Sequence, residues 1–463
     1  MDELLAVTRG RPSDVIAPTP ASYRFDLYPE HLKLNGQPSE QSLVYRPADA
    51  AAIARLLPWA AAKGLTVVPF GLGSNVVGAI DGRADIVVSF ERMNAVLELD
   101  EVSQIVTAQA GISGGALEAA VQEHGFTVGH YPQSLHVSTI GGWVSTRATG
   151  TYSAHYGGIE RSVCGATVVL ADGEVLRIGP RVRAPGGLDL LTVLCGAEGS
   201  LGVLTEVSLA VYRRPDEQWI CASFPALRDG LAAQRELSQA GFPIGLMRLF
   251  NKAETTALFD LDGSSGSVVL LLSTLGPAAV SQASAQAIRS LIPSLGGSLL
   301  ADDAAESWLS ARYRGAELMR DPNSQPGQML DTIEASVPWA NAIACAEELE
   351  EAFEDISVPY FLHFSHTYPS GVGLYMILHL SDATDADVLE TWRQSWRLAL
   401  AIVQRHAGAI GHHHGVGAAR AELYANSADG LLHRKVKEAL DPQGVLYSRL
   451  LGAQGEPATT GTL

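Results

Sequence analysis

The sequence is short of cysteine, of positive charge and of long apolar runs, and each shortage excludes a class of protein. Its 463 residues contain 4 cysteines, whose spacing fits neither a zinc site nor a disulfide framework, so we expect reduced core thiols. There are 32 Lys and Arg against 50 Asp and Glu, a net charge of -18, which excludes nucleic acid as a partner. No apolar stretch reaches the roughly 18 residues that span a bilayer, and no signal segment is seen, so we expect a cytoplasmic protein.

Glycine and apolar residues are plentiful by contrast. Hydrophobic residues make up 47% of the chain and charged residues 18%, which suits a well-packed protein, and the length predicts two domains. Many of the 46 glycines cluster beside apolar runs, where the backbone must approach something that leaves no room for a Cβ atom. A bound cofactor would account for that clustering.

Alternating apolar patterns predict a chain of mixed strands and helices whose character changes near residue 214. Residues 1–45 look Pro-rich and irregular, up to a first short strand that begins at Leu43. The following pattern predicts a helix over 50–62, strands over 65–70, 85–89 and 104–108, and a hairpin of 166–170 with 175–178 about Asp172-Gly173. After Arg213-Arg214-Pro215, strand-like segments such as 220–224 and 267–273 alternate with Ala-rich helices, which is typical of an α+β cap.

Two glycine-rich loops carry the first functional signal. Gly71-Leu72-Gly73-Ser74-Asn75 follows a strand, so its amides can point at an anion, although it matches neither the Rossmann fingerprint nor a P-loop. The second loop, residues 132–150, is dense in small residues and hydroxyls. Each loop alone can be a structural turn, but together they indicate a cradle for a large, planar, polar ligand.

With a third segment, Gly196 to Thr205, these loops resemble the FAD-binding fold shared by vanillyl-alcohol oxidase, D-lactate dehydrogenase and alkyldihydroxyacetonephosphate synthase. The resemblance implies that the first loop holds the pyrophosphate, the second lines the pyrophosphate and isoalloxazine, and the third helps to bind the adenosine half. The cofactor is expected to be FAD, held without a covalent bond. The residues to which the resemblance gives contact with FAD are Pro69, Gly71, Leu72, Gly73, Ser74, Asn75, Pro132, Ser138, Thr139, Gly141, Gly142, Ser145, Thr146, Ala148, Glu198, Gly202 and Val203.

The same resemblance fixes the expected organisation. We expect an α+β protein in which a PCMH-type FAD-binding domain of two subdomains precedes an α+β cap with an antiparallel sheet. The expected boundaries are 1–40 for an amino-terminal segment, 41–214 for the FAD domain, 215–420 for the cap, 421–454 for a helical segment returning to the FAD domain, and 455–463 for a disordered tail.

Three consecutive histidines, His412-His413-His414, precede Gly-Val-Gly in the cap. Neighbouring residues of a helix or strand point to different faces, so amphipathic packing does not explain the run. A metal site and a structural role for buried carbonyls are alternatives, but contiguous histidines seldom chelate one ion and no Cys or carboxylate stands at a zinc spacing, so we expect no metal. We favour a base that takes and returns a substrate proton.

This histidine run, with Gly141 to Ala148 and Ser336-Val337-Pro338-Trp339, most resembles the alkyldihydroxyacetonephosphate synthase family. The resemblance implies catalytic roles for Tyr375, Arg320 and the histidines, and substrate contacts for Arg248 and Arg420. It also implies exchange of an acyl ester for an alkyl ether through a flavin N5 adduct, without net redox change. Two departures from the family are the first loop, which reads Gly-Leu-Gly-Ser-Asn rather than Gly-Gly-Gly-Thr-Ser, and Ala418, where a lysine usually follows Gly-Val-Gly.

Two other functions remain open. A D-2-hydroxy-acid dehydrogenase or oxidase of the same fold would pass a hydride to the flavin, although the His-Gly-Glu or Glu-His-Gly pattern of those enzymes is absent here. A flavin-carrying scaffold without activity is the third reading. The expected partners are a small lipid-like or phosphorylated substrate and a second copy of the chain in a homodimer, with peripheral membrane contact left open.

Overall fold

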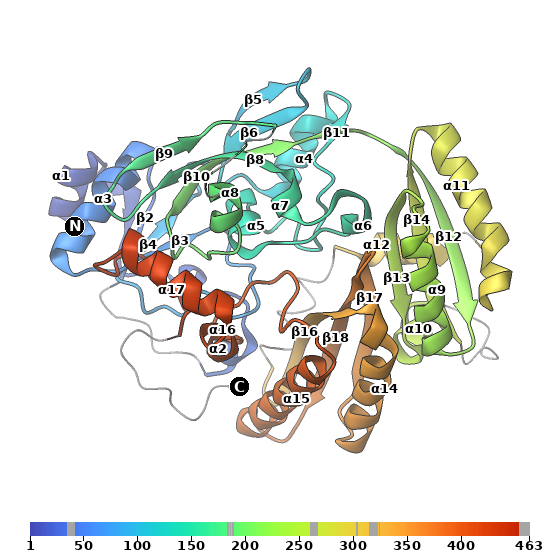
Figure 1. Ribbon diagram of the computed structural model, residues 1–463. Helices are drawn as coiled ribbons and strands as arrows, with labels where there is room; N and C mark the ends of the chain where they lie inside the picture. Colours follow the sequence, from blue (N-terminus) through green and yellow to red (C-terminus); the bar gives the residue numbers. More distant parts are fainter. Residues whose placement is uncertain are drawn as a thin grey trace.

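In its described residues, the amino-terminal half contains two larger β-sheets and one two-stranded sheet, as the computed structural model shows (Figure 1). The structure describes residues 1–34, 42–182, 185, 187, 189–259, 267–301, 304–313, 323 and 325–452. The first sheet has the order β1-β2-β4-β3, from Val15–Ile16, Leu43–Tyr45, Ile86–Ser89 and Val67–Phe70. The second has the order β5-β6-β10-β8-β9, from Val96–Asp100, Ile105–Gln109, Val203–Ala210, Val163–Val169 and Val175–Ile178.

Local sequence signals mark both ends of the longest helix of this half. Helix α3 (Ala50–Lys63) begins where the Asp49 carboxylate accepts the Ala52 amide at 2.8 Å, and it ends at Gly64, whose φ is 66°. The Asp172-Gly173 turn joins β8 to β9 as an antiparallel hairpin, as its sequence predicts. The remaining helices are α4 (Gly114–Gln122), α5 (Ile140–Thr146), α6 (Ser153–Tyr156), α7 (Ile159–Ser162) and α8 (Leu190–Leu194).

The prediction that residues 1–45 are irregular was wrong. This region contains α1 (Asp2–Thr8) and α2 (Pro29–Leu34) besides β1. Leu4 of α1 is 1% exposed and joins the apolar cluster around α3. A helix this short is marginal in isolation, and its burial against a distant helix is what stabilises it, so the local pattern gave little signal.

The carboxy-terminal half is built on one antiparallel sheet, and Tyr212–Arg213 (β11), which pairs with Phe126–Thr127 (β7), precedes it. The sheet has the order β15-β12-β14-β13-β17-β18-β16. Its strands are Ser298–Leu299, Asp216–Phe224, Val268–Gly276, Ile244–Phe250, Tyr360–Tyr368, Gly371–Ser381 and Gln328–Pro338. The expected α+β fold with an antiparallel cap sheet is thereby confirmed.

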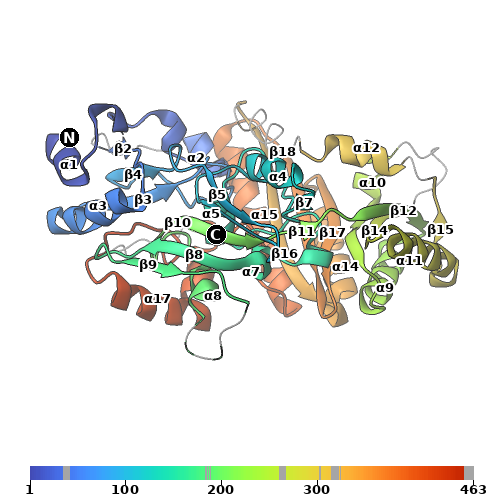
Figure 2. The same ribbon diagram turned by 90° about the horizontal axis from the view of Figure 1, so that it is seen from above.

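Four of the described helices cover one face of this sheet, and the other face is turned toward the amino-terminal half (Figures 1 and 2). The covering helices are α9 (Leu227–Gln239), α11 (Ala278–Leu291), α14 (Trp339–Asp355) and α15 (Asp385–Arg405). On the other face lie α10 (Lys252–Leu258), α12 (Ala304–Ala311) and α6 from the first half. Tyr156 of α6 and Tyr152, just before the helix, pack there with cap residues such as Phe250.

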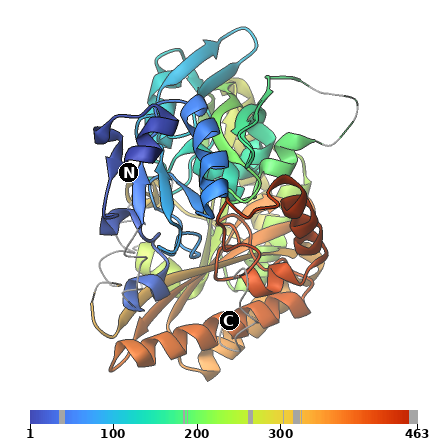
Figure 3. The ribbon, with the colours of Figure 1, turned by 90° about the vertical axis from the view of Figure 1, so that its left-hand side faces the viewer.

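The chain ends by returning to the first half, where α17 lies beside the FAD domain in Figure 3 and Figure 1. Helices α16 (Ala421–Ala425) and α17 (Ala428–Leu440) lead to a segment whose Leu446 pairs with Val67 of β3. His433 of α17 lies 2.8 Å from Ser200 Oγ. The tail predicted at 455–463 lies outside the described residues. Among the described helices, none is long and apolar enough to cross a bilayer.

Candidate active site

One cavity of about 490 Å³ lies between the two halves and brings most of the predicted residues together. Three loops of the first half meet four strands of the cap sheet around it. The predicted FAD-contact residues that line it are Pro69, Gly71, Leu72, Gly73, Ser74, Asn75, Pro132, Ser138, Thr139, Gly141, Gly142, Ser145, Thr146, Ala148, Glu198 and Gly202. Val203 is the exception, because its side chain is fully buried in the core around α3.

The first loop presents a row of unused backbone donors. Among the described residues, the amides of residues 71–76 donate to no protein acceptor. Gly73 has a φ of 67°, and a Cβ atom on Gly71 would lie 2.6 Å from Thr139 Oγ1, so both positions require glycine. Clustered free amides at the edge of a cavity suit a pyrophosphate, which accepts several hydrogen bonds at once.

The second loop is held by its own hydroxyl groups. Thr139 Oγ1 accepts the Gly142 amide at 3.1 Å and so starts α5, while Ser138 Oγ accepts Trp143 Nε1 at 2.7 Å. The small residues Gly141, Gly142, Ser145, Thr146 and Ala148 line the cavity together with the buried ring of Trp143.

Glu198 of the third segment has a contact that the sequence did not predict. Its carboxylate accepts the amides of Val416 and Gly417, directly after the histidine run, and it adopts a φ of 47°. Burial raises the pKa of Glu198 to about 7, against the effect of these amides. The residue therefore joins the FAD domain to the histidine loop. Asn75 Nδ2 makes a second such link, donating to the His414 carbonyl at 2.8 Å.

The cap wall of the cavity follows from strand alternation. In β17, Leu362 and Phe364 pack under the covering helices, while His363 and Ser365 face the cavity. In β18, Tyr375 likewise faces the cavity between the core residues Leu374 and Met376. A sheet with helices on one face thus supplies polar residues to the site from its other face.

Arg248 of β13 is a buried cation at this wall. It is 9% exposed, and its guanidinium lies 5.2 Å from the Trp308 ring centre and 5.7 Å from that of Phe250. Burial lowers its pKa, and in the described part of the chain no carboxylate oxygen lies within 4.0 Å of it. A buried guanidinium that has no ion-pair partner among the described residues is well placed to receive an anionic group.

Beside Arg248 lies a carboxylate–imidazole pair. The Nδ1 atom of His363 lies 2.9 Å from Glu254 Oε2, and both residues are buried. The His363 ring stacks on Tyr375 with centres 4.9 Å apart. Burial raises the pKa of Tyr375 to about 12, so its phenol stays protonated and remains a hydrogen-bond donor at neutral pH.

Glu334 of β16 organises the histidine loop. Its carboxylate accepts the amides of His412 and His414 and forms an ion pair with Arg420. Burial alone would raise the Glu334 pKa, but Arg420 and the histidine loop outweigh it and hold the pKa below its ordinary value. Arg420, predicted to contact substrate, does not line the cavity. It is 1% exposed and donates to the carbonyls of Ile410 and Gly415 instead.

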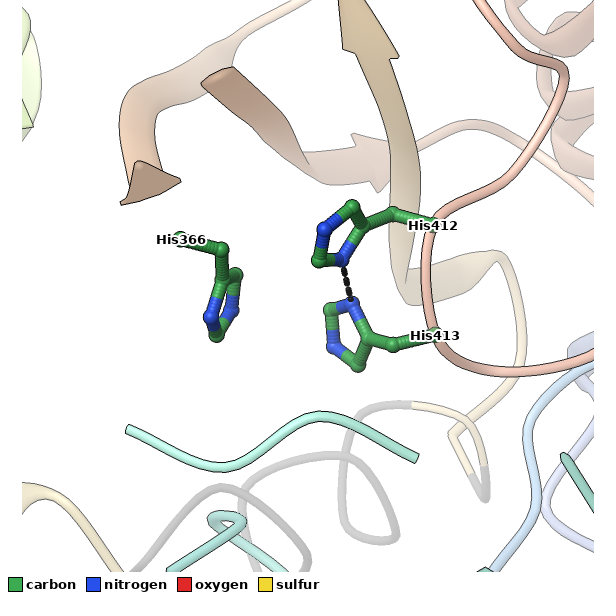
Figure 4. A group of neighbouring side chains, drawn as sticks. All are labelled: His366, His412 and His413. Atoms are coloured by element: carbon green, nitrogen blue, oxygen red, sulfur yellow. Dashed lines mark hydrogen bonds between the residues drawn. The ribbon is translucent and has the colours of Figure 1, made fainter. Parts of the chain in front are cut away.

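The histidines form a hydrogen-bonded cluster (Figure 4). The Nδ1 atoms of His412 and His413 lie 2.8 Å apart, and His412 Nε2 lies 2.8 Å from the Tyr368 hydroxyl. His366 stacks on His412 with ring centres 5.0 Å apart and uses its own Nδ1 to contact Ser153 Oγ at 2.7 Å. One nitrogen from each of the three rings lies within 4.8 Å of the others, a spacing that a metal ion can bridge. Both nitrogens of His412 already have protein partners, which favours a proton network.

The predicted catalytic residues are only partly together in this cavity. Tyr375, His413 and His414 line it, as does Arg248, which was predicted to contact substrate, whereas His412 lies behind His413. Arg320 lies outside the described residues. Sequence reasoning missed Glu334, Tyr368 and the Glu254–His363 pair. A signal existed for His363, which alternates with apolar residues in a strand, but nothing local marks Glu334, because its partners lie about 80 residues away.

Comparisons with known proteins agree with this geometry. The FAD binding domain family matches residues 41–179, and the family of FAD linked oxidases, C-terminal domain, matches residues 214–449. Alkyldihydroxyacetonephosphate synthase of Dictyostelium discoideum is 26% identical over 448 residues, 88% of this chain and 73% of its own length. Glycolate oxidase subunit GlcD of Bacillus subtilis is 24% identical over 439 residues, 92% of this chain and 90% of its own.

The fold has a close counterpart among solved structures. One of alkyldihydroxyacetonephosphate synthase superposes with a TM-score of 0.80 at 21% identity, covering 96% of this chain and 85% of the other. The unpaired amides of residues 71–76 and the small residues of the second loop fit the pyrophosphate and ring of FAD. The chain therefore belongs to the FAD-linked oxidases, and its cofactor is FAD.

Proposed function

We propose that this protein exchanges the acyl ester of an acyl-dihydroxyacetone phosphate for an alkyl ether, in the manner of alkyldihydroxyacetonephosphate synthase. The observation that carries the proposal is the composition of the cavity beyond the FAD loops. Buried Arg248 stands there among apolar walls contributed by Leu246, Leu258, Trp308, Leu330, Phe361 and Ile377. A substrate that has both an anionic group and a hydrocarbon chain suits such walls, and a small hydroxy acid uses only the charged part.

The chain's own residues supply three tasks. His413 or His414 takes a proton from the substrate carbon, because both rings line the cavity and burial lowers the pKa of each, which keeps them neutral. Tyr375 donates a hydrogen bond to the departing carboxylate. Arg248 attracts the substrate's anionic group. When bound, FAD supplies an electron-accepting ring that activates the substrate carbon.

Arg320 remains part of this proposal as a second cation for the carboxylate or phosphate. The support for this role is the spacing of Arg320 to Ser336-Val337-Pro338-Trp339 in the sequence. A homodimer also remains a proposal. Peripheral membrane contact is a further proposal, since a lipid-like substrate must be delivered from a lipid phase.

The second candidate is oxidation of a 2-hydroxy acid, favoured by the glycolate oxidase relative and by the presence of histidines and Arg248 in one cavity. A hydride leaving the substrate would reduce FAD, whereas the exchange reaction leaves it oxidised.

Anaerobic spectroscopy of the purified yellow protein separates the two. We expect D-lactate and glycolate to leave the flavin absorbance unchanged, and an acyl-dihydroxyacetone phosphate with a long-chain alcohol to yield free fatty acid and an ether product by mass spectrometry. Bleaching by a hydroxy acid without ether formation would replace the first proposal by the second. The Tyr375→Phe variant should lose ~10–100-fold in kcat with little change in KM.

A further inference from the structure

The histidine cluster poses a physical problem for the proposed base. Burial lowers the pKa of His413 well below its ordinary value, with His414, His366 and His412 adding to the effect. A ring in these surroundings resists becoming a cation, yet a base must accept a proton. A neutral imidazole can do so if it gives up its other proton at the same time.

The geometry offers such a path. His413 lines the cavity, and its Nδ1 is taken by His412, which leaves Nε2 for the substrate. Two Nδ1 atoms 2.8 Å apart can form a hydrogen bond only if one carries the proton and the other the lone pair. His412 Nε2 continues the chain to the Tyr368 hydroxyl at 2.8 Å.

Tyr368, at the outer end of this hydrogen-bond path, is partly exposed. Tyr368 ends β17 and is followed by the exposed residues Pro369 and Ser370. Exposed Glu160 and Arg161 of α7 are near enough to influence the Tyr368 pKa, which burial raises. Tyr368 therefore keeps a proton at neutral pH and can pass one on only by receiving another.

We propose that His413, His412 and Tyr368 form a proton relay from the cavity to the protein surface. The inference rests on the proposed function in one respect, that His413 acts as the base. Before the reaction, Tyr368 accepts from His412 Nε2–H, and His412 Nδ1 accepts from His413 Nδ1–H.

Each proton then moves one bond outward. His413 Nε2 takes the substrate proton, His413 passes its Nδ1 proton to His412 Nδ1, and His412 passes its Nε2 proton to Tyr368. Tyr368 releases its own hydroxyl proton to solvent. One proton enters, one leaves, and both rings end neutral with the opposite tautomers. Return of a proton reverses the sequence.

Other groups around the relay fix the positions of its two imidazole rings. Glu334 accepts the His412 amide, with Arg420 as its counter-charge. His366 stacks on His412, and Tyr375 stacks on His413 with ring centres 5.8 Å apart. A relay through both nitrogens of a ring requires a fixed ring orientation, and these contacts restrict the rotation of each ring.

The test compares Tyr368→Phe with Tyr360→Phe, a control at the other end of the same strand whose ring packs on Phe353. We expect Tyr368→Phe to lower kcat ~10–100-fold at unchanged KM and FAD content, and to enlarge the solvent deuterium isotope effect on kcat. Tyr360→Phe should change neither. Equal kcat and isotope effects in wild type and Tyr368→Phe would overturn the relay.

A second arm needs no turnover. Nitrogen-15 NMR of histidine-labelled holoprotein reports the tautomer of each ring, and we expect Tyr368→Phe to shift the tautomer balance of both His412 and His413. Unchanged spectra for His413 would overturn the coupling. If the wild type turns over none of the substrates above, the proposed function fails, and the spectra still decide whether the two rings and the phenol are coupled.

His412→Ala supplies a rescue experiment. Added imidazole can occupy the space of the lost ring, so we expect it to restore part of kcat. If His412→Ala loses activity that imidazole fails to restore, and its isotope effect is that of the wild type, His412 serves the structure of the loop and the relay is rejected.

Discussion

The Oε1 atom of Glu334 lies 2.9 Å from Nη2 of Arg420, and both side chains are removed from solvent, at 0% and 1% exposure. This pair joins a strand of the cap sheet to the segment that follows the histidine run. Because Glu334 also accepts two amides of that run, the ion pair fixes the backbone from which His413 and His414 reach the cavity.

Glu334→Gln should destabilise the protein by ~3–5 kcal/mol, because it leaves Arg420 as a buried charge without its partner. Urea denaturation followed by fluorescence measures the loss. Glu354→Gln, on the exposed side of α14, is the matched control and should be neutral. An unchanged midpoint for Glu334→Gln would mean that Arg420 is neutralised by some other group.

Glu198→Gln should change how stability depends on pH. The Glu198 pKa is raised by burial to about 7 from 4.5, so the folded state binds the proton more tightly than the unfolded state. The stability that this proton contributes is complete below pH 4.5 and is lost as the pH rises through about 7.

We therefore expect the free energy of unfolding of the wild type to fall by ~1–3 kcal/mol relative to Glu198→Gln between about pH 5 and pH 8. Denaturation curves at both pH values test this, with exposed Glu123→Gln as the control. Parallel pH profiles for wild type and Glu198→Gln would show that Glu198 ionises normally.

Gly71→Ala should weaken FAD binding about tenfold or more. The new Cβ would lie 2.6 Å from Thr139 Oγ1, and relieving such a contact costs about 1–3 kcal/mol. Moving Thr139 also disturbs the start of α5. Gly179→Ala has open space around its Cβ and should bind FAD like the wild type. Flavin fluorescence titration of the apoproteins compares all three.

Arg248→Met should raise the KM for the anionic substrate ~10–100-fold, since hydrogen bonds to a charged group contribute about 1.5–3 kcal/mol. FAD content should not change. Arg235→Met, on the solvent side of α9, is the control. If Arg248→Met has the KM of the wild type, Arg248 is not an anion site, and the apolar walls are the only part of the cavity that still supports the proposal.

The sequence by itself determined many of the strands, the FAD loops and the family, but not the helices of residues 1–34. Period-two alternation is a local property, so the strands and the hairpin at Asp172-Gly173 could be predicted, and glycine loops after strands indicate phosphate binding wherever they occur. The histidine run marked the second half of the site in the same way, because contiguous polar rings do not fit an amphipathic element.

Tertiary structure alone decided which side chains work together. Glu334, Glu254 and Tyr368 look like ordinary residues of a strand or helix, and each gains its role from partners that lie 44 to 109 residues away or on the other side of the cavity. It also turned Arg420 away from the cavity to its buried ion pair and gave Glu198 to the histidine loop. A buried charge needs an oppositely charged partner, and the folded backbone can supply that partner from any position in the sequence. Local sequence patterns therefore do not indicate which residue the partner is.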